Sequence, residues 1–500
     1  MEQPRVLRIF ALALLLAASG PGRSCAEPAG LFIDSTDVGN PGKPGKTEFE
    51  ESRQAYQVSG GGENMWFTND SFHMVWTKMS GDLSLAATIR WIGSEGNAHR
   101  KACLIIRQSL DNDSPYVDAA LHGNGLTSLQ YREIPGGVTR EIQSALTGPS
   151  RLRIEKHGAY VSMSVALPGE KLHPAGGAFR IAFTSPFYVG LAVCAHDNSR
   201  LEKAEFTAVE LNTLPAPAAG QKLPLASTLE IVPISSADRR VILYSTEKLE
   251  APNWSRDGQF LLFNRLQRIC KMAVKGGPVQ VLDTAPLVHC SSHHGISPDG
   301  SQLALSDLGD GGQSRIYVMS FADRKPALVT SAAPSFWHGW SPDGRLLVYA
   351  AERQDRQDVY TIPVEGGAER RLTADAGRND GPDFSPDGRF IYFESDRGGS
   401  WQIWRMKADG SDPVQVTTDE FNNCSPHPSP DGKWIAYLSW PKGGRVLPLN
   451  KDVQLRLMSL RTGQVQVLAN FLGGQGSLDV PSWSPDSERL AFVSYQPIYP

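Results

Sequence analysis

Short apolar stretches, each preceded by a polar turn, recur at nearly regular intervals along the second half of the chain. Each stretch has the length of a strand and is rich in branched and aromatic residues, and no long helical periodicity interrupts the series. The turns begin at Ser255, Ser297, Ser341, Ser385, Ser429 and Ser484. The stretches that follow them read QFLLFN, SQLALSD, RLLVYAA, RFIYFES, KWIAYLS and ERLAFVS. This pattern predicts a repeated all-β unit.

Each repeat contains more than one such strand. A second strand follows the first, as in SRIYVMS (314–320), and a third follows that, as in ERRLTA (369–374). With the short strand that enters each turn, the unit has four strands in about 43 residues, which is one blade of a β-propeller. The last repeat lacks two strands, and 227–246 aligns with 357–375. We therefore expect 227–246 to pair with the C-terminal strands and to close a ring of six blades.

The turn sequence SPDG has a structural explanation. Proline fixes φ at the first corner, aspartate accepts hydrogen bonds from nearby amides, and glycine adopts a positive φ. The serine hydroxyl bonds backbone groups of the same turn. The turns are therefore assigned no chemistry.

The first half of the chain predicts a different all-β unit. Its strand-length segments are β-rich and are separated by Gly, Asn, Asp or Pro, which is typical of a two-sheet antiparallel sandwich. The segments are 83–91, 102–109, 114–123, 127–134, 151–158 and 187–196. A stretch rich in Pro and Ala then lacks any periodicity. We expect a sandwich over 27–211, a linker over 212–226 and the propeller over 227–500.

The N-terminus predicts export. Arg5 and Arg8 precede an apolar run over 9–18 that is too short to cross a bilayer, and small residues stand before Glu27. We interpret 1–26 as a signal peptide and expect a periplasmic or secreted protein with no membrane span. The net charge of −4 over 500 residues shows no basic excess, which argues against a nucleic-acid partner. A monomer is expected.

The cysteine pattern does not indicate a fold stabilised by disulfides. Five remain after the proposed signal peptide, an odd number with no metal-ribbon spacing. One pair, such as Cys103 with Cys194, is able to form in an oxidising compartment.

Two resemblances follow from these segments. The SPDG repeats over 227–500 resemble the TolB-like group of exported bacterial propellers. The segments KACLIIRQSLDNDSPYVDAALHGNGLTSLQYRE and YVGLAVCAHDNSRLEKAEF resemble concanavalin-like (laminin-G-like) sandwiches attached to bacterial exported enzymes and receptors. The DG-x-x-W turn common in those sandwiches is missing from ALPGEKLHPAGG, which weakens an assignment to sugar binding. Trp66, Trp76 and Trp91 are candidates either for stacking on a sugar or for the core.

Histidines stand just before the turns, where a propeller brings distant residues to one mouth. His294 and His338 replace a proline found at that position in other repeats, and His427 lies one position later. Neutral imidazoles from three repeats predict a divalent metal site for Mn, Ca or Zn, with Gln475 or an aspartate completing it. The alternative is that these histidines bond neighbouring loops and shape a polar mouth.

The same mouth contains other candidate residues. Asp380 and Asp383 are candidate acid–base groups if the protein is an enzyme. The candidate ligand-binding residues are Glu250, Asn253, Trp337 and Asp479. Trp337 and the other tryptophans beside the turns also suit packing between blades.

Two functions follow from this mouth. The first is recognition of a glycan or protein segment in the bacterial envelope. The second is a metal-dependent carbohydrate lyase or hydrolase, because the histidines and Gln475 resemble the axial metal site of oligogalacturonate lyases. Those enzymes have seven blades, one more than is predicted here.

Overall fold

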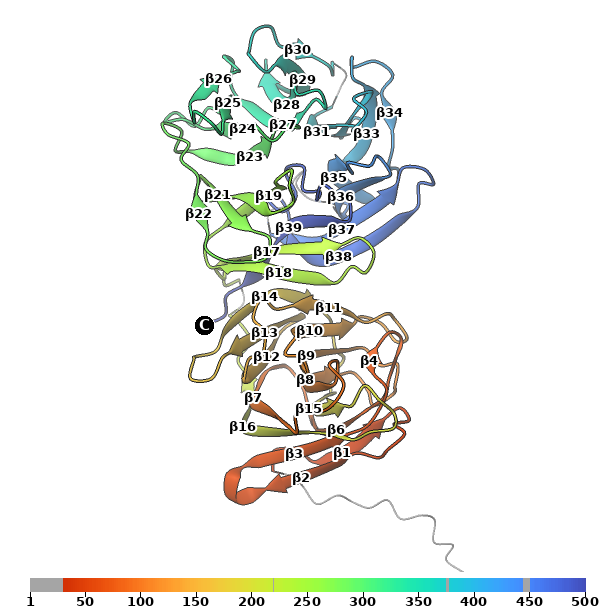
Figure 1. Ribbon diagram of the computed structural model, residues 1–500. Helices are drawn as coiled ribbons and strands as arrows, with labels where there is room; N and C mark the ends of the chain where they lie inside the picture. Colours follow the sequence, from red (N-terminus) through yellow and green to blue (C-terminus); the bar gives the residue numbers. More distant parts are fainter. Residues whose placement is uncertain (1–29, 219, 375–376, 444–449) are drawn as a thin grey trace, which may run out of the picture.

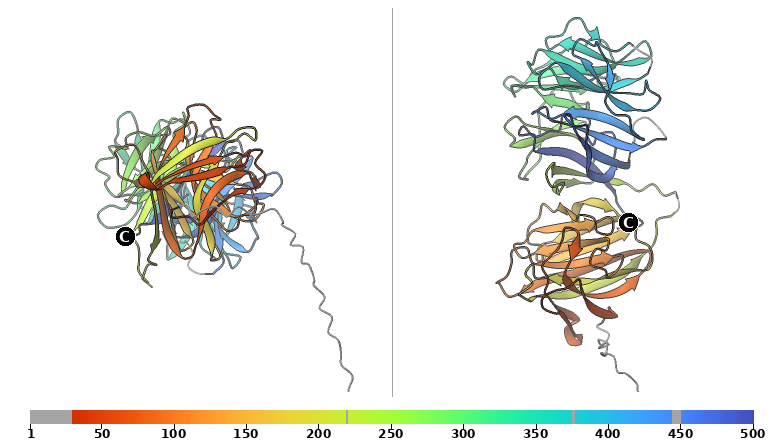
Figure 2. Two further views of the ribbon diagram at one scale, coloured as in Figure 1. Left: turned by 90° about the horizontal axis from the view of Figure 1, so that it is seen from below. Right: turned by 90° about the vertical axis from the view of Figure 1, so that its right-hand side faces the viewer.

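The protein is built almost entirely of β-strands. The computed structural model describes residues 30–218, 220–374, 377–443 and 450–500, so the predicted signal peptide lies outside the described residues. The strands form an elongated molecule in which the N-terminal half and the C-terminal half are stacked end to end (Figures 1 and 2). In the described part of the chain, no helix is long and apolar enough to span a membrane.

Within the described residues, the N-terminal half contains sixteen strands and one short 3-10 helix, η1 (Glu51–Arg53). The first eight strands are β1 (Asp34–Val38), β2 (Lys46–Glu50), β3 (Ala55–Gly60), β4 (Met65–Trp66), β5 (Asn69–Asp70), β6 (Phe72–Met79), β7 (Asp82–Ile92) and β8 (Lys101–Arg107). The next eight are β9 (Tyr116–His122), β10 (Thr127–Arg132), β11 (Arg140–Gln143), β12 (Arg151–His157), β13 (Tyr160–Ala166), β14 (His173–Arg180), β15 (Phe187–Cys194) and β16 (Glu202–Leu214).

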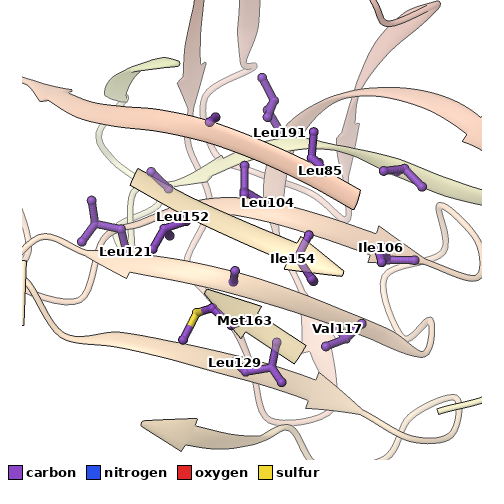
Figure 3. Close-up of a cluster of buried hydrophobic side chains, with 14 of the residues drawn as sticks. Leu85, Leu104, Ile106, Val117, Leu121, Leu129, Leu152, Ile154, Met163 and Leu191 are labelled. Atoms are coloured by element: carbon purple, nitrogen blue, oxygen red, sulfur yellow. The ribbon is translucent and has the colours of Figure 1, made fainter. Parts of the chain in front are cut away.

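Two antiparallel sheets of this half share one hydrophobic cluster. One sheet has the order β14-β13-β12-β7-β16-β3-β2, and the other begins β1-β6-β15-β8-β9-β10-β11. Leu85 and Ile154 come from the first sheet and Leu104 and Val117 from the second, and all four are fully buried in the cluster (Figure 3). Along β12 buried residues alternate with half-buried ones, because successive side chains point to opposite faces of a strand.

The C-terminal half contains the strands of the repeats. The first twelve are β17 (Leu225–Pro233), β18 (Arg239–Ser245), β19 (Leu249–Trp254), β20 (Phe260–Arg265), β21 (Arg268–Ala273), β22 (Gln280–Val281), β23 (Cys290–Ile296), β24 (Gln302–Asp307), β25 (Arg315–Ser320), β26 (Pro326–Leu328), β27 (Ser335–Trp340) and β28 (Leu346–Arg353). The others are β29 (Arg356–Pro363), β30 (Arg370–Arg371), β31 (Asn379–Phe384), β32 (Phe390–Ser395), β33 (Gln402–Lys407), β34 (Val414–Gln415), β35 (Phe421–Pro428), β36 (Trp434–Pro441), β37 (Lys451–Ser459), β38 (Val465–Gly473) and β39 (Arg489–Pro497).

The repeats form a propeller-like arrangement, as the sequence predicts. Four separate four-stranded antiparallel sheets follow one another along the chain: β19–β22, β23–β26, β27–β30 and β31–β34. The predicted turn chemistry is confirmed at SPDG 341–344. The Ser341 hydroxyl donates to Asp343 (2.6 Å) and accepts from the Leu346 amide (2.9 Å), while Gly344 has φ +70°. The turns therefore hold each innermost strand against the next strand.

The chain closes on itself through β17 and β39. These strands pair antiparallel from Leu225↔Pro497 to Pro233↔Arg489, which confirms the predicted pairing of this segment with the C-terminal strands. The sequence did not predict that the sheet continues into the N-terminal half. β18 pairs parallel with β11 through Ile142↔Arg239, so a single sheet of fourteen strands runs through both halves.

The suggested disulfide between Cys103 and Cys194 is not formed. Both are buried free thiols, as are the other cysteines of the described residues. In the pairing of β8 with β15, Cys194 lies opposite Lys101 and Cys103 lies opposite Ala192, so the two thiols are diagonal neighbours. The Cys194 Sγ instead contacts the carbonyl oxygen of Ser71 at 3.4 Å. Sequence spacing could not reveal this register.

Candidate functional site

A β-bulge interrupts the innermost strand of five repeats. The register shifts lie between Glu250/Asn253, Cys290/His294, Trp337/Gly339, Asp380/Asp383 and Cys424/His427. Three bulge residues at one repeat position, Ala251, Gly381 and Ser425, have φ between +52° and +55°. A bulge redirects the side chains that follow it. Each of these five repeats therefore presents two groups of residues along its innermost strand, one before the bulge and one after it.

Before the bulge, or within it, two histidines and an aspartate gather. The rings of His293 and His338 meet edge to face with centroids 4.9 Å apart. His338 Nε2 lies 3.3 Å from Asp380 Oδ1, and Gln357 donates to the other Asp380 oxygen at 2.6 Å. Burial, reinforced by the charge of His338, lowers the pKa of His293 to about 4. Burial opposes ionisation of Asp380, but the contact with His338 outweighs it and lowers the pKa of Asp380.

His294 points away from this cluster. It is fully buried, and neither ring nitrogen has a hydrogen-bond partner. Burial is the main reason that its pKa falls to about 3, so the ring is neutral at ordinary pH. Because neighbouring residues on a strand face opposite ways, His293 rather than His294 meets His338.

His427 is bonded to protein at both ring nitrogens. Its Nδ1 lies 3.1 Å from Asp383 Oδ2, and its Nε2 donates to the Leu478 carbonyl oxygen at 3.0 Å. The Trp483 indole donates to the His427 carbonyl at 2.8 Å. Burial raises the pKa of Asp383, against the opposing effect of His427. His427 thus joins three successive repeats and offers no free lone pair.

The residues predicted to bind a metal do not meet. Within the described residues, no three His, Cys, Asp or Glu side chains form a group that could hold a metal ion. Gln475 is exposed in the segment after β38. His294, His338, His427 and Gln475 therefore occupy four different environments, and metal binding remains a prediction from the sequence.

A cavity of about 270 Å³ lies among the repeats, lined by residues of their turns and of the segments that enter the turns. Asn253, Trp337 and Asp383 line it, as predicted for a shared mouth. Asn253 also connects neighbouring repeats, since its amide donates to the Pro481 carbonyl (2.6 Å) and accepts from the Ile296 amide (3.1 Å). The prolines of the lining are Pro298, Pro342, Pro386, Pro428, Pro430 and Pro481. We call this cavity the axial pocket.

Three predicted carboxyl groups lie outside the lining of the axial pocket: Glu250, Asp380 and Asp479. Glu250 forms an ion pair with Lys248 at 2.5 Å, and burial raises its pKa, with a smaller contribution from the charge of Asp479. Asp380 belongs to the histidine cluster described above. Glu250 and Asp380 lie before the bulges of their strands, whereas Asn253 and Asp383 lie after them.

The tryptophans beside the turns connect repeats. Trp340 donates its indole hydrogen to the Gly295 carbonyl at 3.0 Å. Trp337 is 1% exposed and packs on Gly295, where an added Cβ would lie 2.1 Å from the indole ring. Only a residue without a Cβ fits this contact. The flat rings thus fill the space between repeats and form part of the axial pocket.

Sequence reasoning missed two ionisable residues. Arg256 lines the axial pocket and donates from Nε to the Ser297 carbonyl at 3.0 Å. The sequence feature that could have indicated Arg256 is the first turn, SRDG, in which arginine replaces the proline of the other turns. Glu394 is buried beside the histidine cluster, accepts from the Ser425 amide, and has its pKa raised well above the ordinary value by burial. Its position in an apolar strand gave no signal.

Comparison with known proteins agrees with this architecture. The model of the TolB β-propeller domain matches residues 331–450. A protein of Agrobacterium fabrum is 41% identical over 275 residues, which cover 55% of this chain and 94% of the relative. The solved structure of a putative TolB from Agrobacterium tumefaciens is 41% identical, covers 55% of this chain and 99% of that chain, and has a TM-score of 0.53.

A more distant relative is the Tol-Pal system protein TolB of Francisella tularensis, 26% identical over 139 residues. Those residues cover 25% of this chain and 30% of that protein. The fold and the axial pocket define an all-β, propeller-like protein. The chain belongs to the TolB-like β-propeller family.

Proposed function

We propose that this protein recognises an extended segment of a partner protein at the axial pocket, in the bacterial envelope. The observation that carries the proposal is the lining of that pocket, to which every repeat contributes proline or tryptophan, either from its turn or from the segment that enters the turn. Flat, rigid rings provide contact area at a low cost in conformational entropy. Arg256 adds a cationic group, and Asp383, which is paired with His427, adds a carboxyl group. A volume of about 270 Å³ admits a few side chains rather than a folded domain.

The architecture behind this proposal has six blades and a sandwich. β35–β38 would form the fifth blade, and β39, β17 and β18 the sixth, completed by the bridge Trp483↔Leu490. The two N-terminal sheets with their shared core would form the concanavalin-like sandwich over 27–211. The linker proposed over 212–226 would be the segment between β16, which ends at Leu214, and β17, which begins at Leu225, and the propeller proposed over 227–500 would follow it.

The envelope is proposed from two observations. Residues 1–26 have the pattern of a signal peptide, and a relative has the name Tol-Pal system protein TolB. The protein would act as a monomer in the periplasm or after secretion. Since the match spans 30% of that relative, its whole role does not transfer to this chain.

The competing enzyme function receives less support from the geometry. A metal-dependent lyase or hydrolase needs imidazole nitrogens that are free to bind a metal, and both nitrogens of His427 are bonded to protein. Asp383, one proposed acid–base group, is the partner of that histidine.

Selection of peptides on the purified protein tests the proposed function. A random peptide library displayed on phage would be selected on the wild type and on Arg256→Ala, with Arg345→Ala as the matched control at an exposed turn. We expect a consensus peptide that binds the wild type and Arg345→Ala alike and binds Arg256→Ala at least several-fold more weakly. Absence of any consensus, or binding to neutral and acidic glycan panels that Arg256→Ala weakens, would overturn recognition of a protein segment.

A further inference from the structure

A further cavity lies between the first two four-stranded sheets of the repeats, β19–β22 and β23–β26 (Figure 1). Its volume is about 650 Å³, which is within the range of pockets that hold small organic ligands. We call it the inter-repeat pocket. It shares Arg256 and Ile296 with the axial pocket, and the rest of its lining is different. It is therefore a separate site that the proposed function does not use.

The most buried lining of the inter-repeat pocket belongs to the hydrophobic core between the two repeats. Leu262, Ile296 and Met319 are members of one buried cluster, and each is at most 5% exposed. Phe260 and Phe321 pack against that cluster, are half-buried and also line the pocket. The core is thus open to a ligand at this point, and an apolar ligand would be stabilised by leaving water there.

Three cationic side chains line the same pocket: Arg256, Lys271 and Arg324. Arg256 donates from Nε to the Ser297 carbonyl at 3.0 Å, and Lys271 Nζ lies 3.7 Å from the centre of the Phe260 ring. Among the residues that the structure describes, none of the three cations forms an ion pair. Cations without a countercharge beside a cavity are free to donate charge-assisted hydrogen bonds to an anionic ligand.

Arg256 occupies a position that the other turns give to proline. In four turns the glycine faces the proline of a neighbouring turn, as at Gly344, where an added Cβ would lie 3.9 Å from Pro298. At Gly300 the neighbouring atoms belong to Arg256, the nearest at 3.5 Å. The boundary between the first two repeats therefore carries a guanidinium group where other boundaries carry an uncharged ring.

The two carboxyl groups of the lining are bonded within their own segments. Asp257 accepts from the Ser255 hydroxyl at 2.5 Å and from the Gln259 amide at 3.0 Å. These bonds, the one from Ser255 first, lower the pKa of Asp257. Asp283 accepts from the Ala285 amide at 3.2 Å. Three cations without ion pairs thus stand against two carboxyl groups that already have donors, and this balance favours an anionic ligand.

We infer that the inter-repeat pocket binds a small amphipathic anion, a molecule with an apolar body and one terminal carboxylate or phosphate group. The apolar body would lie against Phe260 and Phe321. The anionic group would accept hydrogen bonds from Lys271 and Arg324. A cationic ligand would meet three cations without countercharges, and a neutral apolar ligand would gain no charge-assisted hydrogen bond.

Titration of the full chain with matched ligands tests this inference. Decanoate, decyl phosphate, decanol and decylammonium have the same apolar chain and differ in the head group. Each would be titrated calorimetrically below its critical micelle concentration. We expect saturable binding of at least one of the two anions, and binding of decanol and decylammonium that is weaker by about tenfold or more, because both lack the charge-assisted hydrogen bonds. The tighter of the two anions identifies the head group.

Single substitutions locate the ligand. Lys271→Ala and Arg324→Ala are each expected to weaken binding of the anion by about tenfold, because each removes a charge-assisted hydrogen bond. Arg405→Ala is the matched control and should bind as the wild type does. Arg405 takes the position of Lys271 in the fourth repeat, where it lies 4.4 Å from the centre of the Phe390 ring and outside the inter-repeat pocket.

The outcomes separate this site from the axial pocket. Lys271 and Arg324 do not line the axial pocket, so peptides selected there should bind both variants as they bind the wild type. The inference is overturned if neither anion binds, if decanol or decylammonium binds as tightly, or if Lys271→Ala and Arg324→Ala bind the anion as Arg405→Ala does. It is also overturned if selected peptides lose binding in Lys271→Ala, because the inter-repeat pocket would then hold a protein segment.

Discussion

His427 and Asp383, which come from adjacent repeats, form a buried pair with 3.1 Å between Nδ1 and Oδ2. The other ring nitrogen donates to Leu478 of the following repeat. A carboxylate only accepts hydrogen bonds, so Nδ1 must carry the shared proton or Asp383 must be protonated. The pair fixes one side of the axial pocket, which Asp383 lines.

The first prediction concerns His427→Ala. The substitution leaves a buried carboxyl group and a buried carbonyl without partners, each costing about 1–3 kcal/mol. We expect the free energy of unfolding to fall by about 2–5 kcal/mol, measured by urea denaturation. His289→Ala is the matched control, because the His289 side chain is 41% exposed and its ring contacts Gln267 at 3.1 Å and Asp310 at 3.7 Å. Equal losses in the two variants would show that the pair contributes nothing.

The second prediction concerns Asp118 on β9. Both of its carboxyl oxygens are buried without hydrogen-bond partners. Burial raises the pKa of Asp118 to about 7, although Lys101 opposes the shift. The folded protein therefore holds a proton that the unfolded chain, with its ordinary pKa of 3.8, releases. Stability associated with Asp118 is present at acidic pH, falls as the pH rises from about 4 to about 7, and is constant above that window.

Asp118→Asn should remove this dependence. Between about pH 4 and pH 7, the free energy of unfolding of the variant is expected to rise relative to that of the wild type by up to about 1.4 kcal/mol for each pH unit. The variant should therefore be more stable than the wild type at pH 8. Urea denaturation at a series of pH values measures the difference. Asp310→Asn, at an exposed loop, should follow the wild-type curve. Parallel curves for wild type and Asp118→Asn would contradict the raised pKa.

The repeats were predictable from the sequence because turn chemistry is local. Ser, Pro, Asp and Gly each satisfy the turn within a few residues, as Ser341 and Asp343 illustrate. The same turn residues also predicted the resemblance to the TolB-like propeller family, which the matching family model supports. The continuation of the sheet from β11 into β18 was not predictable, because it depends on how two distant edges meet.

The histidine positions show where sequence reasoning fails. His294 and His338 lie at the same distance before their serines, so the sequence aligns them. In the structure His294 pairs with Leu305 on the ladder, whereas His338 is the extra residue between Trp337 and Gly339. The bulge therefore shifts which residue faces the axis, and His293 takes the place expected for His294. Residue spacing does not show where a bulge falls.

The third prediction concerns metal. Because both nitrogens of His427 are bonded and His294 faces away, we expect purified protein to hold no stoichiometric Mn, Ca or Zn after dialysis. Elemental analysis of the wild type and His338→Ala provides the measurement. Metal at one ion per chain that His338→Ala loses would contradict the expectation and would restore the enzyme hypothesis.

The fourth prediction concerns the pair that supports ring closure. Glu230 on β17 receives two hydrogen bonds of 2.7 Å from Arg239 on β18 and one from Ser494 on β39, and all three side chains are buried. Glu230→Gln leaves the Arg239 cation without a countercharge, which costs about 3–5 kcal/mol in buried pairs. We expect the free energy of unfolding, measured by urea denaturation, to fall by a similar amount. Adding Arg239→Met should recover much of it, because removing both charges removes the unpaired cation. If the double variant is as unstable as Glu230→Gln, unpaired charge is not the cause, and the loss lies in the packing of β17 against β39.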